Sequence, residues 1–571
     1  MEKRELQGNP FFLNEEQIEW VNTTLRNMTT EEKVGQLFCL ISYNCDEERL
    51  KSLAKDYKVG GVMGRVMPLE EVHKMISILQ QEAEIPLLIA ANFEAGGDGL
   101  MQEGTNVGPN LQVGATKDVH FAEMQGYVCG REGAAIGANW AFAPVIDIDY
   151  NFRNPIMGTR LYGSDKEFVK ECGVAYTKAA QKQGIAVSIK HFPGDGCDER
   201  DQHLVTSINS LSCEEWDESY GKAYKACIDA GALTVMVGHI MQPAYSKYFC
   251  PDIKDEDIMP ATLAPELLNG LLREKLGFKG MIVTDATTMV GMTCVMDRKE
   301  AVPRTIAAGC DMFLFTKNQD EDYEYMLEGV RKGIITQERL DDAVMRILAT
   351  KAALKLPEKK ENGTLIPDIQ CAKTIVGCKE HKEIEKQCTD AAVTLVKNKD
   401  TILPLDVKKY KRILLYPIYS GENAIGYDGG ESITEKVTSA LRKEGFEVAV
   451  FEPLPGREGA LVRYDEIPKK YDLLLYISNL VTKSNQTVVR IEWEQPMGAN
   501  CPIYLNVVPT IFVSFANPYH LIDVPRVKTY INAYKFKDTN VTAVIDKLLG
   551  RSEFKGMDPV DSYCGMWDTH L

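Results

Sequence analysis

The sequence lacks any long uninterrupted hydrophobic segment. None of its apolar runs approaches the ~20 residues that a helix needs to cross a bilayer. The first twenty residues, MEKRELQGNPFFLNEEQIEW, also lack the apolar core of a secretion signal. We therefore expect a protein that is neither exported nor inserted into a membrane.

Closely spaced cysteine pairs are missing as well. The 15 cysteines are scattered without a CxxC pair, and several, such as Cys39 and Cys310, lie in apolar stretches. An odd number of scattered cysteines in a large chain is typical of reduced thiols, so we expect a cytoplasmic location.

Positive charge is in deficit. The chain has 65 lysines and arginines against 82 aspartates and glutamates, a net charge of −17 at pH 7. Such a surface repels nucleic acid and anionic membranes, although solubility alone is a sufficient explanation for it. We therefore expect neither nucleic acid nor membrane as a partner, and the sequence does not indicate an oligomeric state.

Short apolar runs alternate with helical segments over the first 350 residues. Continuous hydrophobicity suits strands that are buried on both faces, as in parallel sheets. Eight such strands with intervening helices predict an α/β fold, a (β/α)₈ barrel over residues 1–355, with seven or nine strands left open. The expected strands are Gln36–Ser42, Val59–Arg65, Pro86–Asn92, Asn139–Ile148, Ile185–Pro193, Ala232–Ile240, Gly280–Ala286 and Gly309–Thr316.

A second α/β pattern follows a stretch rich in Pro, Gly and charge. The stretch Leu356–Asp368 predicts a linker, which we extend over 356–382. Beyond it, residues 383–571 are expected to form a smaller doubly wound α/β/α sandwich domain, with helices at Glu383–Leu395 and Glu431–Glu444. Its expected strands lie near Ile413–Ile418, Glu447–Phe451, Asp472–Ser478, Thr510–Phe515 and Val527–Ala533.

Polar side chains collect where the predicted barrel strands end, which is where barrel enzymes place their active sites. Each residue alone is more simply a capping or hydrogen-bonding group, and only their convergence indicates a site. They are Arg65, Asn92, Glu94, Asp147, Asp149, Lys190, His191, His239 and Asp285.

Asp285 follows the apolar run Met281–Val283 almost directly. A carboxylate in that place is desolvated, which is costly unless it has a partner or a function. The structural alternative is a cap for a helix that begins at Thr287–Met289.

The stretch from Lys190 to His203 reads KHFPGDGCDERDQH. Its Pro and Gly residues predict a loop that ends in Asp201 and His203, spaced i, i+2. In a turn or extended segment this spacing lets the carboxylate orient the imidazole, which can then act as an acid and base near neutral pH. A charged surface loop is the alternative.

The same stretch resembles the signature K-H-F-P-G-H-G-D-T-x-x-D-S-H of bacterial β-N-acetylglucosaminidases in glycoside hydrolase family 3, with identical spacing from the first Lys to the last His. The likeness extends along nearly the whole chain. Further similar segments are MTTEEKVGQLF, FAPVIDIDYNFRNPIMGTRLYGSD, PATLAPELLNGLLREKLGFKGMIVTDATTM and AAVTLVKNKDTILPL.

The resemblance implies roles for individual residues. Asp285 would be the nucleophile, and His203, oriented by Asp201, the general acid/base. These three are the expected catalytic residues, and neither a metal nor a cofactor is expected. Lys190, His191 and Arg160 would hold hydroxyls of the sugar. From their places at strand ends, we add Asn92, His239 and Arg65, which has no clear family equivalent, to the expected substrate-binding residues.

Two positions depart from the family pattern. Asn92 stands where the family's D-Q-E-G-G segment has a sugar-binding Asp, and Asp195 stands where the signature has His. An amide carries no charge, and charge-assisted hydrogen bonds are roughly twice as strong as neutral ones. The first departure therefore bears on the choice of sugar.

The sequence thus predicts a retaining exo-β-glycosidase acting on a small carbohydrate, with release of β-linked N-acetylglucosamine, including muropeptide-type sugars, as the leading activity. β-Glucosidase, β-xylosidase and a phosphorylase that uses phosphate in place of water stay open. A metal-dependent amidohydrolase-type barrel would need an H-x-H after the first strand, where CLISYN has none. A non-catalytic sugar-binding protein would need neither Asp285 nor His203.

Overall fold

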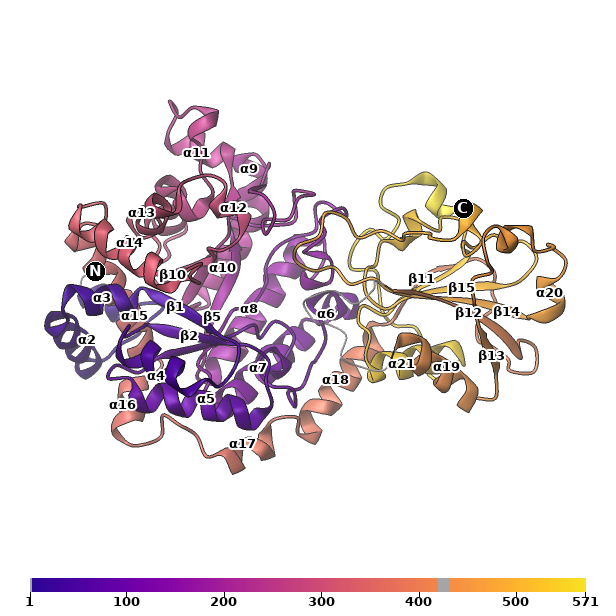
Figure 1. The fold of residues 1–571 in the computed structure, drawn as a ribbon, viewed down its shortest axis with the longest axis horizontal. Helices are drawn as coiled ribbons and strands as arrows, with labels where there is room; N and C mark the ends of the chain where they lie inside the picture. Colours follow the sequence, from indigo (N-terminus) through magenta and orange to yellow (C-terminus); the bar gives the residue numbers. More distant parts are fainter. Residues whose placement is uncertain (1–2, 420–431) are drawn as a thin grey trace. The chain divides into compact units, whose positions relative to one another are not determined.

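The computed structural model describes residues 3–419 and 432–571. Backbone contacts divide the chain into two compact units (Figure 1). The first comprises Met1–Val107, Val119–Asn154 and Asp165–Lys382, and the second comprises Gly108–Asp118, Pro155–Ser164 and Glu383–Leu571. Two short segments of the N-terminal half therefore group with the C-terminal unit.

The first unit is a closed barrel of eight parallel strands. Around the barrel the strands follow the order β1-β10-β9-β7-β5-β4-β3-β2, so neighbours in space are neighbours in sequence apart from the closing pair and the short strands β6 and β8, which pair only with each other. This is a (β/α)₈ barrel, and all eight expected strands are present. The strands are β1 Phe38–Ser42, β2 Gly61–Gly64, β3 Leu88–Ala91, β4 Trp140–Ala141, β5 Ala186–Phe192, β7 Thr234–Val237, β9 Met281–Ala286 and β10 Met312–Leu314, with β6 Ser207–Ile208 and β8 Ile240–Met241 outside the barrel.

Helices surround these strands, and many begin at a capping side chain. Asp46, Asp165 and Thr336, for example, each accept a hydrogen bond from a first-turn backbone N–H, which satisfies a donor that would otherwise be orphaned. The longer helices of this unit are α2 Glu15–Asn27, α3 Thr30–Gln36, α4 Glu47–Lys55, α5 Leu69–Glu82, α7 Val119–Ile136, α8 Lys166–Lys182, α10 Lys222–Asp229, Glu266–Lys275, α13 Arg298–Ala308, α14 Gln319–Arg331 and α15 Gln337–Ala353.

Residues 356–382 form α16 (Leu356–Glu361), α17 (Ile369–Ile375) and the first turn of α18 (Lys379–Ala392). By backbone contacts these residues group with the first unit. The boundaries expected from the sequence, with a linker over 356–382, stay a prediction.

The second unit contains a six-stranded sheet in the order β11-β16-β15-β14-β12-β13. All five expected strands are present, and Figure 1 shows α19 and α21 side by side along the sheet. The bounds are β11 Thr394–Asn398, β12 Arg412–Tyr419, β13 Glu447–Val450, β14 Leu473–Asn479, β15 Thr510–Ser514, β16 Thr529–Asn532, α19 Ile433–Lys443 and α21 Asp538–Leu548.

One element of this sheet was wrongly assigned from the sequence. The helix expected to reach Leu395 ends at Ala392, and β11 begins two residues later and pairs antiparallel with β16. The pairing partner is far away in sequence, so no local pattern reveals it. The expected start of the next helix at Glu431 lies outside the described residues.

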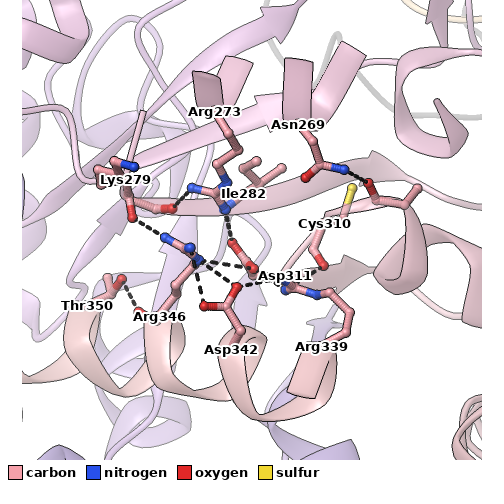
Figure 2. Close-up of polar contacts among 12 residues, drawn as sticks. Asn269, Arg273, Lys279, Ile282, Cys310, Asp311, Arg339, Asp342, Arg346 and Thr350 are labelled. Carbon is pink, nitrogen blue, oxygen red and sulfur yellow. Dashed lines mark hydrogen bonds and ion pairs between the residues drawn. The ribbon is translucent and has the colours of Figure 1, made fainter. Parts of the chain in front are cut away.

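A network of buried charge lies where β9 and β10 begin (Figure 2). The Asp311 carboxylate accepts hydrogen bonds from Arg273 at 2.7 Å, from Arg339 and from the backbone N–H of Ile282 at 2.8 Å. Arg346 pairs with Asp342 at 3.3 Å and donates to the Lys279 carbonyl at 2.5 Å. These bonds therefore hold two helices against the base of the barrel, the end at which the strands begin.

Within the described residues, no helix is both long and apolar enough to cross a membrane. All 15 cysteines are free thiols.

Candidate active site

Asp285 is the next-to-last residue of β9, at the carboxyl end of the strand. Its side chain is 14% exposed, and its Oδ1 accepts the backbone N–H of Ala286 at 2.7 Å. Burial alone would raise its pKa, but His191, His239 and His203 together hold the pKa of Asp285 below its usual value. The carboxylate is therefore ionised at neutral pH and faces three imidazoles.

The end of β5 supplies two basic side chains, each fixed by a carboxylate. Lys190 Nζ lies 2.7 Å from Glu94 Oε1, and the lysine side chain is 3% exposed. His191 Nδ1 lies 2.6 Å from Asp147 Oδ2, which leaves its Nε2 directed at Asp285, 4.0 Å from Oδ2. Because buried charges need partners, Glu94 and Asp147 allow Lys190 and His191 to stand in the barrel mouth.

His203 and Asp201 form the expected dyad. His203 Nδ1 lies 2.7 Å from Asp201 Oδ1, which also accepts the His203 backbone N–H at 2.9 Å. The Asp201 side chain is fully buried, whereas that of His203 is 27% exposed. A fixed Nδ1–H leaves Nε2 able to give and take a proton at the exposed edge of the ring.

His239 follows β7 and is fully buried. Its Nδ1 lies 3.0 Å from the Thr262 hydroxyl and its Nε2 lies 3.0 Å from the carbonyl of Ala286, the residue after Asp285. Burial lowers the pKa of His239, although Asp285 opposes the shift. Both ring nitrogens are thus occupied by protein groups, an arrangement that favours a role in holding the end of β9, and the expected sugar contact stays a prediction.

The other residues expected to contact the sugar are Asn92, Arg65 and Arg160. Asn92 follows β3 and is exposed, and Arg65 follows β2 and is half-buried, without an ion pair among the residues that the structure describes. Arg160 belongs to the second unit, where its carbonyl accepts a hydrogen bond from Asn110. Contacts of these residues with a sugar stay predictions.

Glu94 and Asp147 lie at predicted strand ends, but the sequence does not indicate a role for either. It does not indicate one for Gln202, between the dyad residues, either. Gln202 is 1% exposed, and its side chain is bonded on both sides. The sequence signal for Glu94 and Asp147 is their place at strand ends, and that for Gln202 is its place between Asp201 and His203. A salt-bridge partner from another strand cannot be identified from one sequence.

The strand-end residues do not form a metal-ligand cluster. In the part of the chain that the structure describes, the one group of three suitable side chains with mutually close ligand atoms is Cys378, Glu380 and His381. His381 already contacts the buried Glu132 carboxylate through Nδ1 at 2.6 Å. The barrel mouth is better suited to acid–base and nucleophilic chemistry by its own side chains.

Comparison with known proteins identifies the family. Residues 29–350 match the model for the glycosyl hydrolase family 3 N terminal domain. A beta-N-acetylglucosaminidase/beta-glucosidase of Cellulomonas fimi is 49% identical over 567 residues, which is 99% of this chain and 100% of the relative.

Solved structures agree in fold over the whole chain. The structure of a beta-glucoside phosphorylase, BglX, superposes with a TM-score of 0.93 at 43% identity, covering 100% of both chains. A glycoside hydrolase family 3 beta-N-acetylglucosaminidase from Paenibacillus sp. str. FPU-7 gives a TM-score of 0.77 at 25% identity, covering 94% of this chain and 100% of the other. The chain belongs to glycoside hydrolase family 3 and is a glycosidase.

Proposed function

We propose that the chain is a retaining exo-β-N-acetylglucosaminidase that works by double displacement, with Asp285 as nucleophile and the His203–Asp201 dyad as acid/base. The observation that carries this proposal is the pairing of an ionised, partly accessible carboxylate with an oriented imidazole in one barrel mouth. Retaining glycosidases need a nucleophile and a proton donor on the two sides of the scissile bond.

In the first step, Asp285 attacks the anomeric carbon while His203 Nε2 donates a proton to the departing oxygen. The glycosidic bond breaks, the alcohol leaves, and a glycosyl ester forms on Asp285. Asp201 keeps the Nδ1–H in place and favours the imidazolium before transfer. Lys190 can donate a hydrogen bond to a sugar hydroxyl and His191 Nε2 can form another, because Glu94 and Asp147 fix the two side chains.

In the second step, neutral His203 takes a proton from a water molecule, which attacks the anomeric carbon and releases Asp285. The product keeps the β configuration because two inversions have occurred. The glycone of this proposal rests on the Cellulomonas fimi relative, whose name includes both N-acetylglucosamine and glucose.

Phosphate is the second candidate acceptor. An imidazole in place of a second carboxylate puts no negative charge in the path of an incoming anion, and the 43% identical full-length structure is a beta-glucoside phosphorylase. Attack by phosphate on the glycosyl ester would give the sugar 1-phosphate and free Asp285 without a proton acceptor.

The decisive experiment is product analysis with phenyl β-N-acetylglucosaminide and phenyl β-glucoside, each with and without inorganic phosphate. We expect β-configured N-acetylglucosamine as the first product in water, and the sugar 1-phosphate if phosphate is the acceptor. An α-configured first product overturns double displacement, and turnover of only the glucoside overturns the assigned sugar. Asp285→Ala serves as the inactive control.

We also propose a cytoplasmic location, on the basis of the 15 free cysteines, because free thiols in such number persist in reducing compartments. An active fusion found only in the soluble cytoplasmic fraction agrees with this, and recovery outside the cell contradicts it.

A further inference from the structure

The dyad residues are separated by one residue, Gln202, whose side chain is 1% exposed. Its Nε2 donates to Asp195 Oδ2 at 3.3 Å, and its Oε1 accepts the backbone N–H of His239 at 2.8 Å. A single amide thus bridges the turn after β5 and the end of β7.

The main chain of the dyad segment is also held by hydrogen bonds from the segment that follows β9. The Gln202 carbonyl accepts the N–H of Gly291 at 3.1 Å, and the His203 carbonyl accepts the N–H of Val290 at 3.1 Å. Both donors follow β9, the strand that carries Asp285. The place of His203 relative to the nucleophile therefore depends on bonds made by its neighbour.

Asp195 is itself immobilised on every side. Its backbone N–H donates to Asp147 at 2.8 Å, and its Oδ1 accepts the N–H of Gly196 at 2.7 Å and the Asn154 amide at 3.0 Å. The remaining oxygen, Oδ2, meets Gln202. Burial, followed by the Asp147 charge, raises the pKa of Asp195 to about 6. Burying this carboxylate costs free energy, which indicates a structural or functional role for Asp195.

We infer that Asp195 and Gln202 are a positioning pair that holds the His203–Asp201 dyad at the distance from Asp285 that proton transfer requires. The inference rests on the proposed function and adds two residues that touch neither substrate nor reacting atoms. It also gives a role to the position where the family signature has His. A proton donor must lie within hydrogen-bond reach of the departing oxygen, and a 1 Å displacement can cost on the order of 10²-fold in rate.

The pair can be tested by exchanging its donor and acceptor. Asp195→Asn places an amide N–H opposite the Gln202 amide N–H, and Gln202→Glu places two carboxylates opposite each other. The double variant reverses the bond, because the Asn amide donates to one Glu oxygen while the other oxygen still accepts the His239 N–H. It also keeps one carboxylate and one amide in the pair.

The readout is kcat/KM for two glycosides of the same sugar, 2,4-dinitrophenyl and phenyl. Dinitrophenolate leaves without a proton, whereas phenolate depends on the general acid. We expect each single variant to lose on the order of 10- to 10²-fold with the phenyl substrate and less than about threefold with the dinitrophenyl substrate. The double variant should recover to within about tenfold of the parent.

Asn209→Ala is the matched control. Asn209 is fully buried, donates to the Gly194 carbonyl of the same turn at 3.1 Å, and has no bond to the dyad. We expect it to change both substrates by the same factor.

Equal losses on both substrates in the single variants, or no recovery in the double variant, overturn the inference. If one single variant fails to fold, the other single variant still decides, because the loss of a merely structural pair gives no leaving-group dependence. His203→Ala separates this outcome from failure of the proposed function. If that variant shows no leaving-group dependence, the acid/base assignment is wrong; if it does while the pair variants do not, only the positioning role is wrong.

Discussion

Buried charge lies at both ends of the barrel, and the two clusters differ in what they leave unsatisfied. At the base, the carboxylate of Asp311 is shared among Arg273, Arg339 and a backbone N–H. At the mouth, His191 Nε2 lies 4.0 Å from Asp285 Oδ2, and His203 Nε2 has no hydrogen bond to any described residue. The charged groups at the base are thus paired with one another, whereas some polar groups at the mouth can still bind a ligand.

The energetic meaning of the two clusters differs accordingly. Breaking a buried ion pair costs several kcal/mol because one charge is left alone, even where the intact pair adds little net stability. Burial, followed by the nearby Arg346 charge, lowers the pKa of Arg273 to about 9, so the base holds its excess positive charge at a cost. The mouth holds a negative charge among histidines, which suits a carboxylate that must stay ionised.

Among substitutions at the two ends of the barrel, Asp285→Asn should have the largest effect. We expect kcat for an aryl β-N-acetylglucosaminide to fall about 10⁴-fold, equivalent to ~5.5 kcal/mol, because no other mouth carboxylate can replace the nucleophile. The free energy of unfolding should change by no more than about 1 kcal/mol. Steady-state kinetics and urea unfolding measure the two. Residual activity above a tenth of the parent value means that Asp285 is not the nucleophile.

Asp311→Asn is the reverse experiment. We expect the free energy of unfolding to fall by about 3–5 kcal/mol, since three arginines lose a buried carboxylate partner. Well below the unfolding transition, kcat should stay within about twofold. Denaturant unfolding and kinetics at low temperature provide the test. A loss of activity without a loss of stability would mean that the base communicates with the mouth.

The barrel and part of its mouth could be predicted from local sequence, whereas the ion pairs between strands could not. The barrel was predictable because each strand is a local apolar run that needs no knowledge of its partners. The places of Asp285, Asp201 and His203 were predictable because they follow such a run or a Gly-rich turn within a recognisable motif, and their catalytic roles stay predictions.

The features that the sequence does not predict are those that depend on contacts between residues far apart in the chain. The Lys190–Glu94 and His191–Asp147 pairs join different strand ends, and β11 is defined by pairing with β16. The grouping of residues 108–118 and 155–164 with the second unit is likewise a matter of long-range contact. Periodicity contains no information on such partnerships.

Two buried lysines also differ between the mouth and the base. Lys190 at the mouth pairs with Glu94, whereas Lys351 near the base donates to the neutral Gln36 amide oxygen at 2.6 Å. Burial lowers the pKa of Lys351 to about 7 from an ordinary value of 10.5. Between those values the unfolded chain binds the proton and the folded chain does not, so stability rises as pH rises through this window and is lower below it.

Lys351→Met should therefore flatten the dependence of stability on pH. We expect the free energy of unfolding of the parent, minus that of the variant, to increase by about 2 kcal/mol between pH 7.5 and 9.5. Urea unfolding at each pH gives the values. Lys55→Met, at a lysine whose side chain is 66% exposed, is the control and should leave the difference constant. A constant difference for Lys351→Met as well would mean that this amine keeps its proton in the fold.

The smallest effect is expected at the mouth, from Asn92→Asp, which restores the residue of the family pattern. If Asn92 meets a sugar hydroxyl, the new carboxylate exchanges a neutral hydrogen bond for a charge-assisted one, worth about 0.5–1.5 kcal/mol at an exposed position. The ratio of kcat/KM values between aryl β-glucoside and aryl β-N-acetylglucosaminide should then shift by about 2- to 10-fold. Asn27→Asp adds the same charge at an exposed site on α2 and should leave the ratio unchanged. Equal ratios in both variants would place Asn92 outside the glycone site, and the choice of sugar would then rest with the side chains held at the end of β5.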